Sequence, residues 1–238
     1  MTPLEHILFL DIETVPLSPD YAQLDERERL LWEKKCRQLA RYLPDEEDSS
    51  PDALYERAGI YAEFGKIVCI SVGFFAKKNL RIKSFCTANE YDLLTEFGQM
   101  VGQHFSRPEH RLCAHNGKEF DYPYIARRML INGIKLPSIL NTTGRKPWEN
   151  PHLDTLEMWK FGDYKHYTSL ELLASVFDIP TPKDDIDGSR VAEVYWKENN
   201  LNRITTYCQK DVVTVVRLYQ KMNLLPTVED SNISIIIE

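Results

Sequence analysis

The chain has 238 residues, of which 43% are hydrophobic, enough for one large domain with a real core. Its 29 basic and 36 acidic residues give a net charge of −7, which argues against a protein that holds nucleic acid by bulk electrostatics alone. No run of about eighteen apolar residues is present, so the sequence indicates neither a membrane span nor a signal peptide. The five cysteines form no CxxC pair and predict buried thiols in a reducing cytoplasm.

The first predicted strand is a hydrophobic run, Ile7–Leu10, that ends in the acids Asp11 and Glu13. Because side chains alternate along a strand, the two acids project from the same face. Two like charges held that close repel unless a cation lies between them, and oxygen ligands favour a hard ion such as Mg²⁺ or Mn²⁺. Taken alone, the same residues also fit a strand that ends in a polar turn.

A long insertion, residues 16–60, is expected after this strand. Within it, the helical spacing of Trp32 and Cys36 predicts an amphipathic helix over 25–43. We expect this helix to pack on the domain; a cap over the active site or a docking helix for a partner is the alternative. The acidic stretch 44–51 is predicted to be an exposed loop.

The next part of the chain predicts a hairpin and then a helix. Residues 66–75 are apolar nearly throughout, as in a central strand, whereas residues 79–85 alternate, as in an edge strand. Asn89 is a predicted N-cap for a helix whose apolar stripe reaches Phe105.

Residues 111–115 predict a short strand, followed by a turn and a helix that starts at Asp121 and is closed by Gly133. An Asp at a helix start is most often a cap. A helix start directly after a strand is also where an α/β sheet presents groups to a ligand, and the two roles are compatible.

The segment 137–152 is polar and carries Arg145 and Lys146 beside Trp148. Two bases next to an aromatic ring can hold a phosphate chain and stack a base, and a solvated loop fits the same residues. Four helices are predicted after this segment, over 154–160, 169–177, 189–199 and 201–223, with Ser169 and Ser189 as N-caps.

The last of these helices carries an acid on its core face. Ile204, Cys208 and Val215 share one stripe, and Asp211 falls inside it, with Tyr207 at the margin one turn earlier. An acid among packed apolar groups is costly unless it is paired or bound to a metal. A salt bridge inside the core is the alternative interpretation.

Three motifs bring these acids together. They are Phe9-Leu10-Asp11-Ile12-Glu13-Thr14, His115-Asn116-Gly117-Lys118-Glu119-Phe120-Asp121 and Tyr207-Cys208-Gln209-Lys210-Asp211. In this order they resemble the superfamily of 3′–5′ exonucleases with four acidic metal ligands and a tyrosine in the third motif (DEDDy). The chain is most similar to the proofreading exonuclease domain of family B DNA polymerases, in a bacterial subfamily of stand-alone predicted exonucleases.

The resemblance implies an α/β, ribonuclease H-like fold in which helices flank a mixed central sheet. A single exonuclease domain is expected over 1–238, with the insertion at 16–60 and a C-terminal tail at 226–238. The resemblance also implies two Mg²⁺ or Mn²⁺ ions, of which Asp11 touches both. Glu13 and Asp211 would complete the site of the water-activating ion, and Asp121 would serve the other.

The remaining roles are also carried over by the resemblance. The phenol of Tyr207 would orient the nucleophilic water. Thr14 would lie by the terminal nucleotide, Phe120 would stack near a base and Asn116 would contact the strand.

The predicted function is a metal-dependent 3′–5′ exonuclease that releases nucleoside 5′-monophosphates from the 3′ end of single-stranded DNA or RNA, with DNA favoured. A non-catalytic nucleic-acid-binding or adaptor module is the alternative, although a module that only binds has no need to concentrate negative charge where a phosphate must lie. In a third interpretation, the 25–43 helix or the apolar tail at 233–237 recruits a partner protein. The tail also fits an added edge strand.

Overall fold

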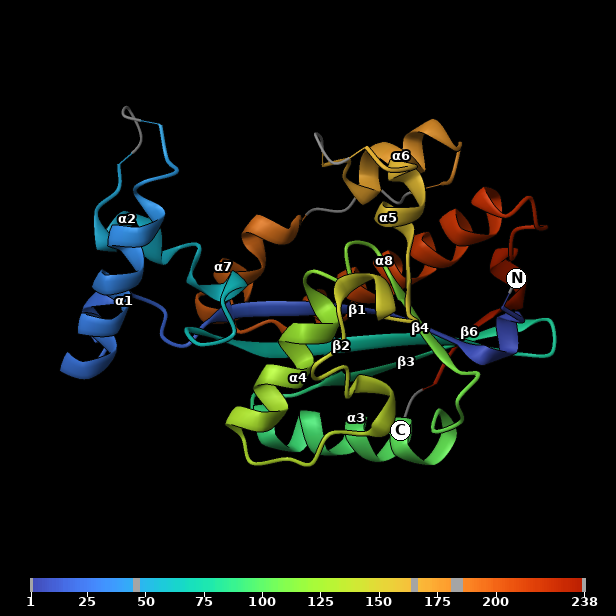
Figure 1. Cartoon of the computed structure of the whole chain (residues 1–238), viewed down its shortest axis with the longest axis horizontal. Coiled ribbons are helices and arrows are strands. Elements are labelled where there is room, and N and C mark those ends of the chain that lie inside the picture. The colour runs from blue at the N-terminus through green and yellow to red at the C-terminus, as the bar shows by residue number, and fades with distance from the viewer. Residues whose placement is uncertain (1, 45–47, 164–166, 181–185, 237–238) are drawn as a thin grey trace.

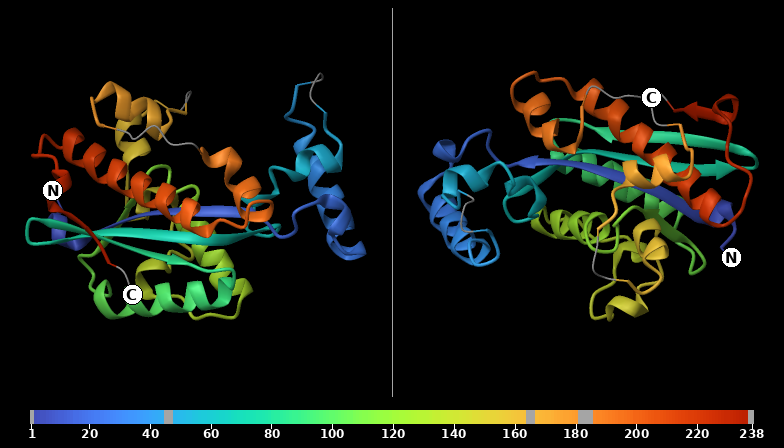
Figure 2. Two further views of the ribbon diagram at one scale, coloured as in Figure 1. Left: turned by 180° about the vertical axis from the view of Figure 1, so that it is seen from behind. Right: turned by 90° about the horizontal axis from the view of Figure 1, so that it is seen from above.

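A computed structural model describes residues 2–44, 48–163, 167–180 and 186–236. Its centre is a six-stranded sheet in the order β5-β4-β1-β2-β3-β6, with helices on both faces (Figures 1 and 2). The strands are β1 (Ile7–Pro16), β2 (Gly65–Ala76), β3 (Asn79–Cys86), β4 (Arg111–Ala114), β5 (Leu153–Asp154) and β6 (Ile233–Ile235). The α-helices are α1 (Glu26–Leu39), α2 (Pro51–Tyr55), α3 (Glu90–His104), α4 (Asp121–Ile131), α5 (Thr155–Lys160), α6 (Leu170–Val176), α7 (Val191–Trp196) and α8 (Leu201–Met222).

The sheet is mixed, as expected. β1 pairs antiparallel with β2 and parallel with β4, and β2 and β3 form the predicted antiparallel hairpin. The central position expected for residues 66–75 is confirmed. The edge position expected for residues 79–85 is wrong, because the C-terminal tail forms β6 and pairs with β3 in parallel. The alternative use of the tail, as an edge strand, is therefore the one that the structure adopts.

β1 separates two apolar layers. Leu8 and Leu10 pack in the cluster that includes α3 and α4, whereas Ile7 and Phe9 pack against α8. The helix α8 lies close to the sheet: a Cβ added at Gly73 would lie 2.8 Å from Val212 Cγ1. The long helix is thus held against the odd-numbered side chains of β1, which is the face that carries Asp11 and Glu13.

The insertion folds around its own aromatic cluster at one end of the sheet (Figure 1). Trp32 is fully buried there and packs with Leu54 and Tyr55. Asp25 and Glu28 form a capping box at the start of α1, which ends at Leu39 and so is shorter than predicted. The helix therefore packs on the insertion itself, while residues 45–47 of the predicted exposed loop lie outside the described residues.

The helices predicted in the C-terminal half are present with small corrections. Ser169 caps α6 as expected. The predicted cap Ser189 is wrong: α7 begins at Val191, and the carboxylate of Asp187 accepts the backbone N–H of Ser189 in the 3₁₀ turn before it. An Asp two residues earlier provides the same local turn that a capping serine would provide.

Two further features concern the hydropathy of the helices and the state of the cysteines. No helix within the described residues is both long and apolar enough to cross a membrane. All five cysteines are free, and four of them are buried, as predicted.

A buried ion pair connects α3, α4 and the start of β2. The guanidinium of Arg128 donates to both carboxylate oxygens of Glu90, which also accepts the backbone N–H of Ile67 at 2.7 Å. Nη1 of Arg128 donates to the carbonyl oxygen of Ala62 at 2.8 Å. The pair thus joins the helices of one layer to the segment that leaves the insertion.

We expect Glu90→Ala to lower the free energy of unfolding by ~3–5 kcal/mol, because it leaves the guanidinium of Arg128 buried without its carboxylate. Urea denaturation measures this loss. Glu96 is exposed on the same helix, so Glu96→Ala is the matched control and should change the free energy by less than ~0.5 kcal/mol. Equal losses in the two variants would contradict the assignment of the pair as a structural support.

Candidate active site

Asp11 and Glu13 interrupt the apolar column of β1 that faces α8. Phe9 before them and Val15 after them both pack in clusters that include residues of α8. The prediction that the acids end the strand is wrong, because β1 continues to Pro16 and stays paired with β2, with a shift of register between Glu13 and Thr14. The pairing with β4 stops at Phe9, so the two acids lie in mid-strand beyond the last partner residue on that side.

The helix α8 places the third motif against these acids. The thiol of Cys208 donates to the backbone carbonyl of Asp11 at 3.4 Å. Ligand atoms of Asp11, Glu13 and Cys208 all lie within 4.8 Å of one another. Asp211 follows Cys208 by nearly one helical turn and is close enough that its charge raises the pKa of both Asp11 and Glu13. The first and third motifs are therefore brought together, as the sequence predicts.

Asp121 joins the group from the start of α4 and is buried. The N-cap residue is Phe120, which makes no side-chain cap, and Asp121 takes the first helical position. Hydrogen bonds from the backbone of Asp121 and of Ile12 lower the pKa of its carboxyl group and so oppose part of its rise. The contact with Ile12 ties α4 to β1 between the two acids of the first motif.

The pKa values of Asp11, Glu13 and Asp121 are all raised. For Asp11 and Glu13, removal from water has the largest effect, and the charges of neighbouring acids add to it. Burial raises the pKa of Asp121 to about 8, and the charge of Asp154 contributes. Deprotonating the whole group therefore costs free energy that a bound cation would recover.

This donor set fits a hard divalent cation. The carboxylates of Asp11, Glu13, Asp121 and Asp211 offer oxygen ligands only, which Mg²⁺ and Mn²⁺ prefer. Cys208 does not fit as a ligand, because burial raises the pKa of its thiol well above its usual range and the protonated sulfur is a poor ligand for a hard ion. Its position is that of a small core side chain under the acids.

Tyr207 lies one turn before Asp211 and is half-buried. Burial raises the pKa of its phenol, and the charges of Asp211, Glu13 and Asp11 raise it further. The phenol therefore keeps its proton at neutral pH, which suits it to orient a neighbouring oxygen by hydrogen bonding rather than to remove a proton.

The three side chains expected to contact the nucleotide lie in different surroundings. The ring of Phe120 is tilted against Tyr124, with 5.3 Å between the centroids. Thr14 also interacts with the phenol of Tyr124, which donates to the carbonyl oxygen of Gly59 at 2.7 Å. Asn116 begins the turn that leads to Phe120: its backbone is left-handed with φ of 63°, and its carbonyl oxygen accepts the N–H of Phe120 at 3.0 Å. Phe120 and Thr14 thus share Tyr124 as a neighbour, and Asn116 is joined to Phe120 through the backbone.

Asp154 is a buried acid whose role the sequence did not reveal. Its Oδ1 accepts the backbone N–H of Asn116 at 3.0 Å and that of Leu156 at 2.9 Å, and its Oδ2 accepts the N–H of Lys118 at 3.0 Å. The one carboxylate therefore both caps α5 and fixes the turn of the second motif. This turn is tight: a Cβ at Gly117 would lie 2.5 Å from that of Ala114. The only sequence signal was an Asp at the start of a predicted helix.

Tyr167 is a second residue that the sequence analysis missed. Its side chain is 66% exposed, and its ring meets the ring of His115 edge-on at 6.3 Å between centroids. Partial burial raises the pKa of its phenol, and the charges of Asp121, Asp154 and Asp11 add to the effect. An exposed aromatic ring thus borders the acid group, at a position outside every predicted helix or strand.

In the metal-free protein, Asp121→Asn should raise the free energy of unfolding by at least ~1 kcal/mol at pH 8, because it removes a repelled buried charge while keeping an oxygen acceptor. The folded-state pKa of Asp121 is about 8, above its ordinary value of 3.8, so the folded state binds more protons and stability falls as pH rises between these values. The gain from the substitution should therefore be small near pH 4 and grow towards pH 8. Urea denaturation in EDTA at several pH values measures it. Exposed Glu119→Gln is the control, and a gain independent of pH would contradict the assignment.

Comparisons with known proteins identify the family of the chain. Residues 60–232 match the model of a family described as "Predicted 3'-5' exonuclease related to the exonuclease domain of PolB". The matched range contains the second and third motifs, and the first motif precedes it. No curated protein matches the sequence.

A solved family B DNA polymerase, from the hyperthermophilic archaeon Pyrobaculum calidifontis, is similar with a TM-score of 0.51 and 15% sequence identity. The match covers 92% of this chain and 27% of the polymerase, so the chain spans about a quarter of that protein. At this identity the likeness shows the fold alone, and the expected ribonuclease H-like mixed sheet flanked by helices is confirmed. Since the family model covers well over half of its residues, the chain belongs to the family of predicted 3′–5′ exonucleases related to the exonuclease domain of PolB.

Proposed function

We propose that the chain is a divalent-metal-dependent 3′–5′ exonuclease of the DEDDy type that releases nucleoside 5′-monophosphates from single strands, DNA in preference to RNA. One observation carries the proposal: acids from three separate elements, β1, α4 and α8, lie so close together that the charges of Asp121 and Asp211 raise the pKa values of both Asp11 and Glu13. A module that only binds nucleic acid gains nothing from such a group, because it repels phosphate.

The four acids have distinct places around the proposed two ions. The charges of Glu13, Asp211 and Asp121 all act on Asp11, so Asp11 is suited to touch both ions. Glu13 and Asp211 would complete one site, and Asp121, from the other side of β1, would complete the second. Two bound divalent metal ions of this kind lower the pKa of a bound water molecule and stabilise charge on a scissile phosphate.

The other residues act by position. Tyr207 would hold the attacking water with its protonated phenol. The acids lie within the fold rather than on a convex surface, so a 3′ end must leave its stacked duplex to reach them, which favours a single-stranded substrate. Thr14, Phe120 and Asn116 would contact that end. The insertion at 16–60 and the tail at 226–238 would belong to the same domain, and the five free thiols suit a reducing cytoplasm.

The central test is incubation of a 5′-labelled single-stranded oligonucleotide with the protein and Mn²⁺, followed by gel electrophoresis. We expect a ladder of products shortened from the 3′ end, no ladder in EDTA, and at least ~1,000-fold slower shortening by Asp11→Ala, because both ion sites lose a ligand. Glu96→Gln, a change at an exposed acid on α3, should leave the ladder intact. A ladder that persists in Asp11→Ala at the wild-type rate would overturn the proposed function.

The role of Tyr207 gives a separate expectation. Tyr207→Phe should lower kcat by ~10–100-fold with little change in KM, because the ring stays in place and only the hydroxyl that orients the water is lost. Steady-state kinetics over a range of oligonucleotide concentrations separates the two constants. An effect confined to KM would assign the hydroxyl to substrate binding.

A further inference from the structure

A hollow of about 430 Å³ lies between the second-motif turn, the segment 142–150 and α5. Its wall carries three lysines and one arginine (Lys118, Lys146, Lys160 and Arg145) and three acids (Glu119, Asp154 and Glu157), together with Trp148. In a chain with a net charge of −7, this is a locally cationic surface.

Two of the three acids in the wall are already engaged. Glu157 forms an ion pair with the ammonium of Lys118. The carboxylate of Asp154 is buried and accepts backbone N–H groups on both sides, from the second-motif turn and from the start of α5. Glu157 and Lys118 offset each other, and backbone N–H groups partly offset the charge of Asp154. In the rest of the wall, the positive charges of Arg145 and Lys146 outweigh the charge of Glu119, so the surface attracts anions.

The hollow adjoins the acid group. Asp154 lies in its wall and raises the pKa of Asp121, and the carbonyl oxygen of Asn116 accepts the backbone N–H of Phe120, the residue before Asp121, at 3.0 Å. Asn116, expected to contact the strand, lines the hollow as well. A chain that ends at the acids can therefore continue directly into this surface.

An aromatic side chain stands beside the bases. The ring of Trp148 is 75% exposed, and the ammonium of Lys146 lies 5.3 Å from its centroid. A solvent-exposed tryptophan ring does not gain the free energy of burial. An exposed aromatic ring beside a cation is the arrangement that binds a single strand through base stacking and phosphate contacts.

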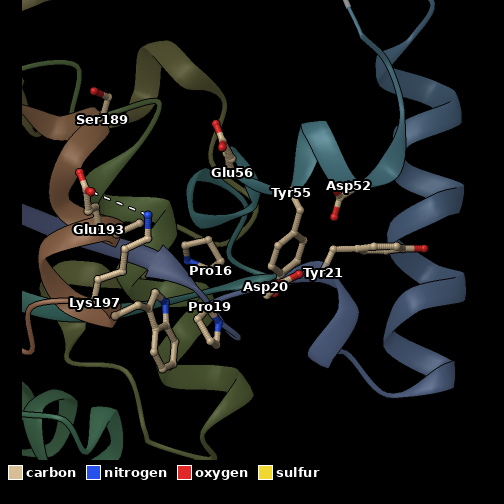
Figure 3. Close-up of a pocket in the computed structure, with 12 residues that line it drawn as sticks. Pro16, Pro19, Asp20, Tyr21, Asp52, Tyr55, Glu56, Ser189, Glu193 and Lys197 are labelled. Carbon is tan, nitrogen blue, oxygen red and sulfur yellow. Dashed lines mark ion pairs between the residues drawn. The ribbon is translucent and has the colours of Figure 1, made fainter.

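A second groove, shown in Figure 3, has the opposite character. It lies between the insertion and α7, has a volume of about 530 Å³, and is lined by four acids (Asp20, Asp52, Glu56 and Glu193) and one lysine, Lys197. The lysine forms an ion pair with Glu193. A phosphate chain is repelled from such a groove, so its charge does not suit it to bind the substrate strand.

We propose that the substrate strand on the 5′ side of the scissile phosphate runs through the cationic hollow, with phosphates at Arg145 and Lys146 and one base stacked on Trp148. This inference rests on the proposed exonuclease function and assigns the surface that binds its substrate. The sequence of segment 137–152 fits both a solvated loop and a strand-binding loop. Under this proposal it is a strand-binding loop.

The first experiment removes the two charges. Arg145→Gln/Lys146→Gln should raise KM for a 12-nucleotide single strand about tenfold and change kcat less than twofold. In EDTA, fluorescence anisotropy should show weaker binding, and the slope of log affinity against log salt should fall by about 1.4, because each lost phosphate contact with a single strand contributes about 0.7. A merely structural role would not change this slope.

Lys77→Gln/Lys78→Gln is the matched control, because both lysines are exposed in the turn between β2 and β3 and their loss changes the net charge equally. It should leave KM and the salt slope unchanged. If both double variants behave like the wild type while the wild type shortens oligonucleotides, the inference is wrong and the proposed function stands. If the wild type shortens no strand, the proposed function fails and this inference fails with it.

The second experiment tests the stacking ring. Trp148→Ala should weaken binding of the 12-nucleotide strand about fivefold or more without changing the salt slope, because stacking releases no counterions. Tyr42→Ala is the control, since Tyr42 is 87% exposed on the insertion. Equal effects of the two variants would remove Trp148 from the proposed path.

Discussion

Repulsion between carboxylates that the fold forces together is the constraint on which the rest of this structure depends. The interface of β1 with α8 is apolar on both sides of the acids, where Phe9 and Val15 pack in clusters with residues of the helix. The absence of a side chain at Gly73 allows α8 to lie close to the sheet, and moving the helix away to relieve the charge would expose these apolar clusters. The free energy of the surrounding apolar contacts thus offsets a local cost, as is common where function requires an unfavourable arrangement.

Each element of the acid group is held by a different kind of contact. Strand pairing with β2 fixes β1, apolar packing fixes α8, and the buried pair of Arg128 with Glu90 anchors α4 at its far end. A polar contact also joins α8 to β3, where the amide of Gln209 donates to the hydroxyl of Ser84 at 2.9 Å. Because these supports are independent, the relative positions of the acids do not rest on one interaction.

The spacing of residues within single strands and helices was sufficient to predict much of this arrangement. The alternation along β1 predicted that Asp11 and Glu13 share a face, and the helical stripe of α8 predicted that Asp211 points inward. Both depend only on the geometry of one element. The continuation of β1 past its acids was missed, because two charges followed by a proline look like the end of a strand, and only pairing with β2 extends it.

Features that depend on distant pairing could not be predicted. The sequence of β3 is typical of an edge strand. In the structure, the C-terminal tail, far along the chain, pairs beside it. The part played by Asp154 depends on β5, whose two residues are too few to leave a periodic signal. Tyr167 reaches the acids from a segment without regular structure, so no pattern of spacing could place its ring there.

The short strands at the two ends of the sheet have a consequence for self-association. β5 has two residues and β6 has three, so each outer ladder exposes few unpaired backbone groups. A long, bare edge on β3 would offer a template for another chain, and β6 covers part of it. The C-terminal tail thereby acts as protection against strand-by-strand aggregation.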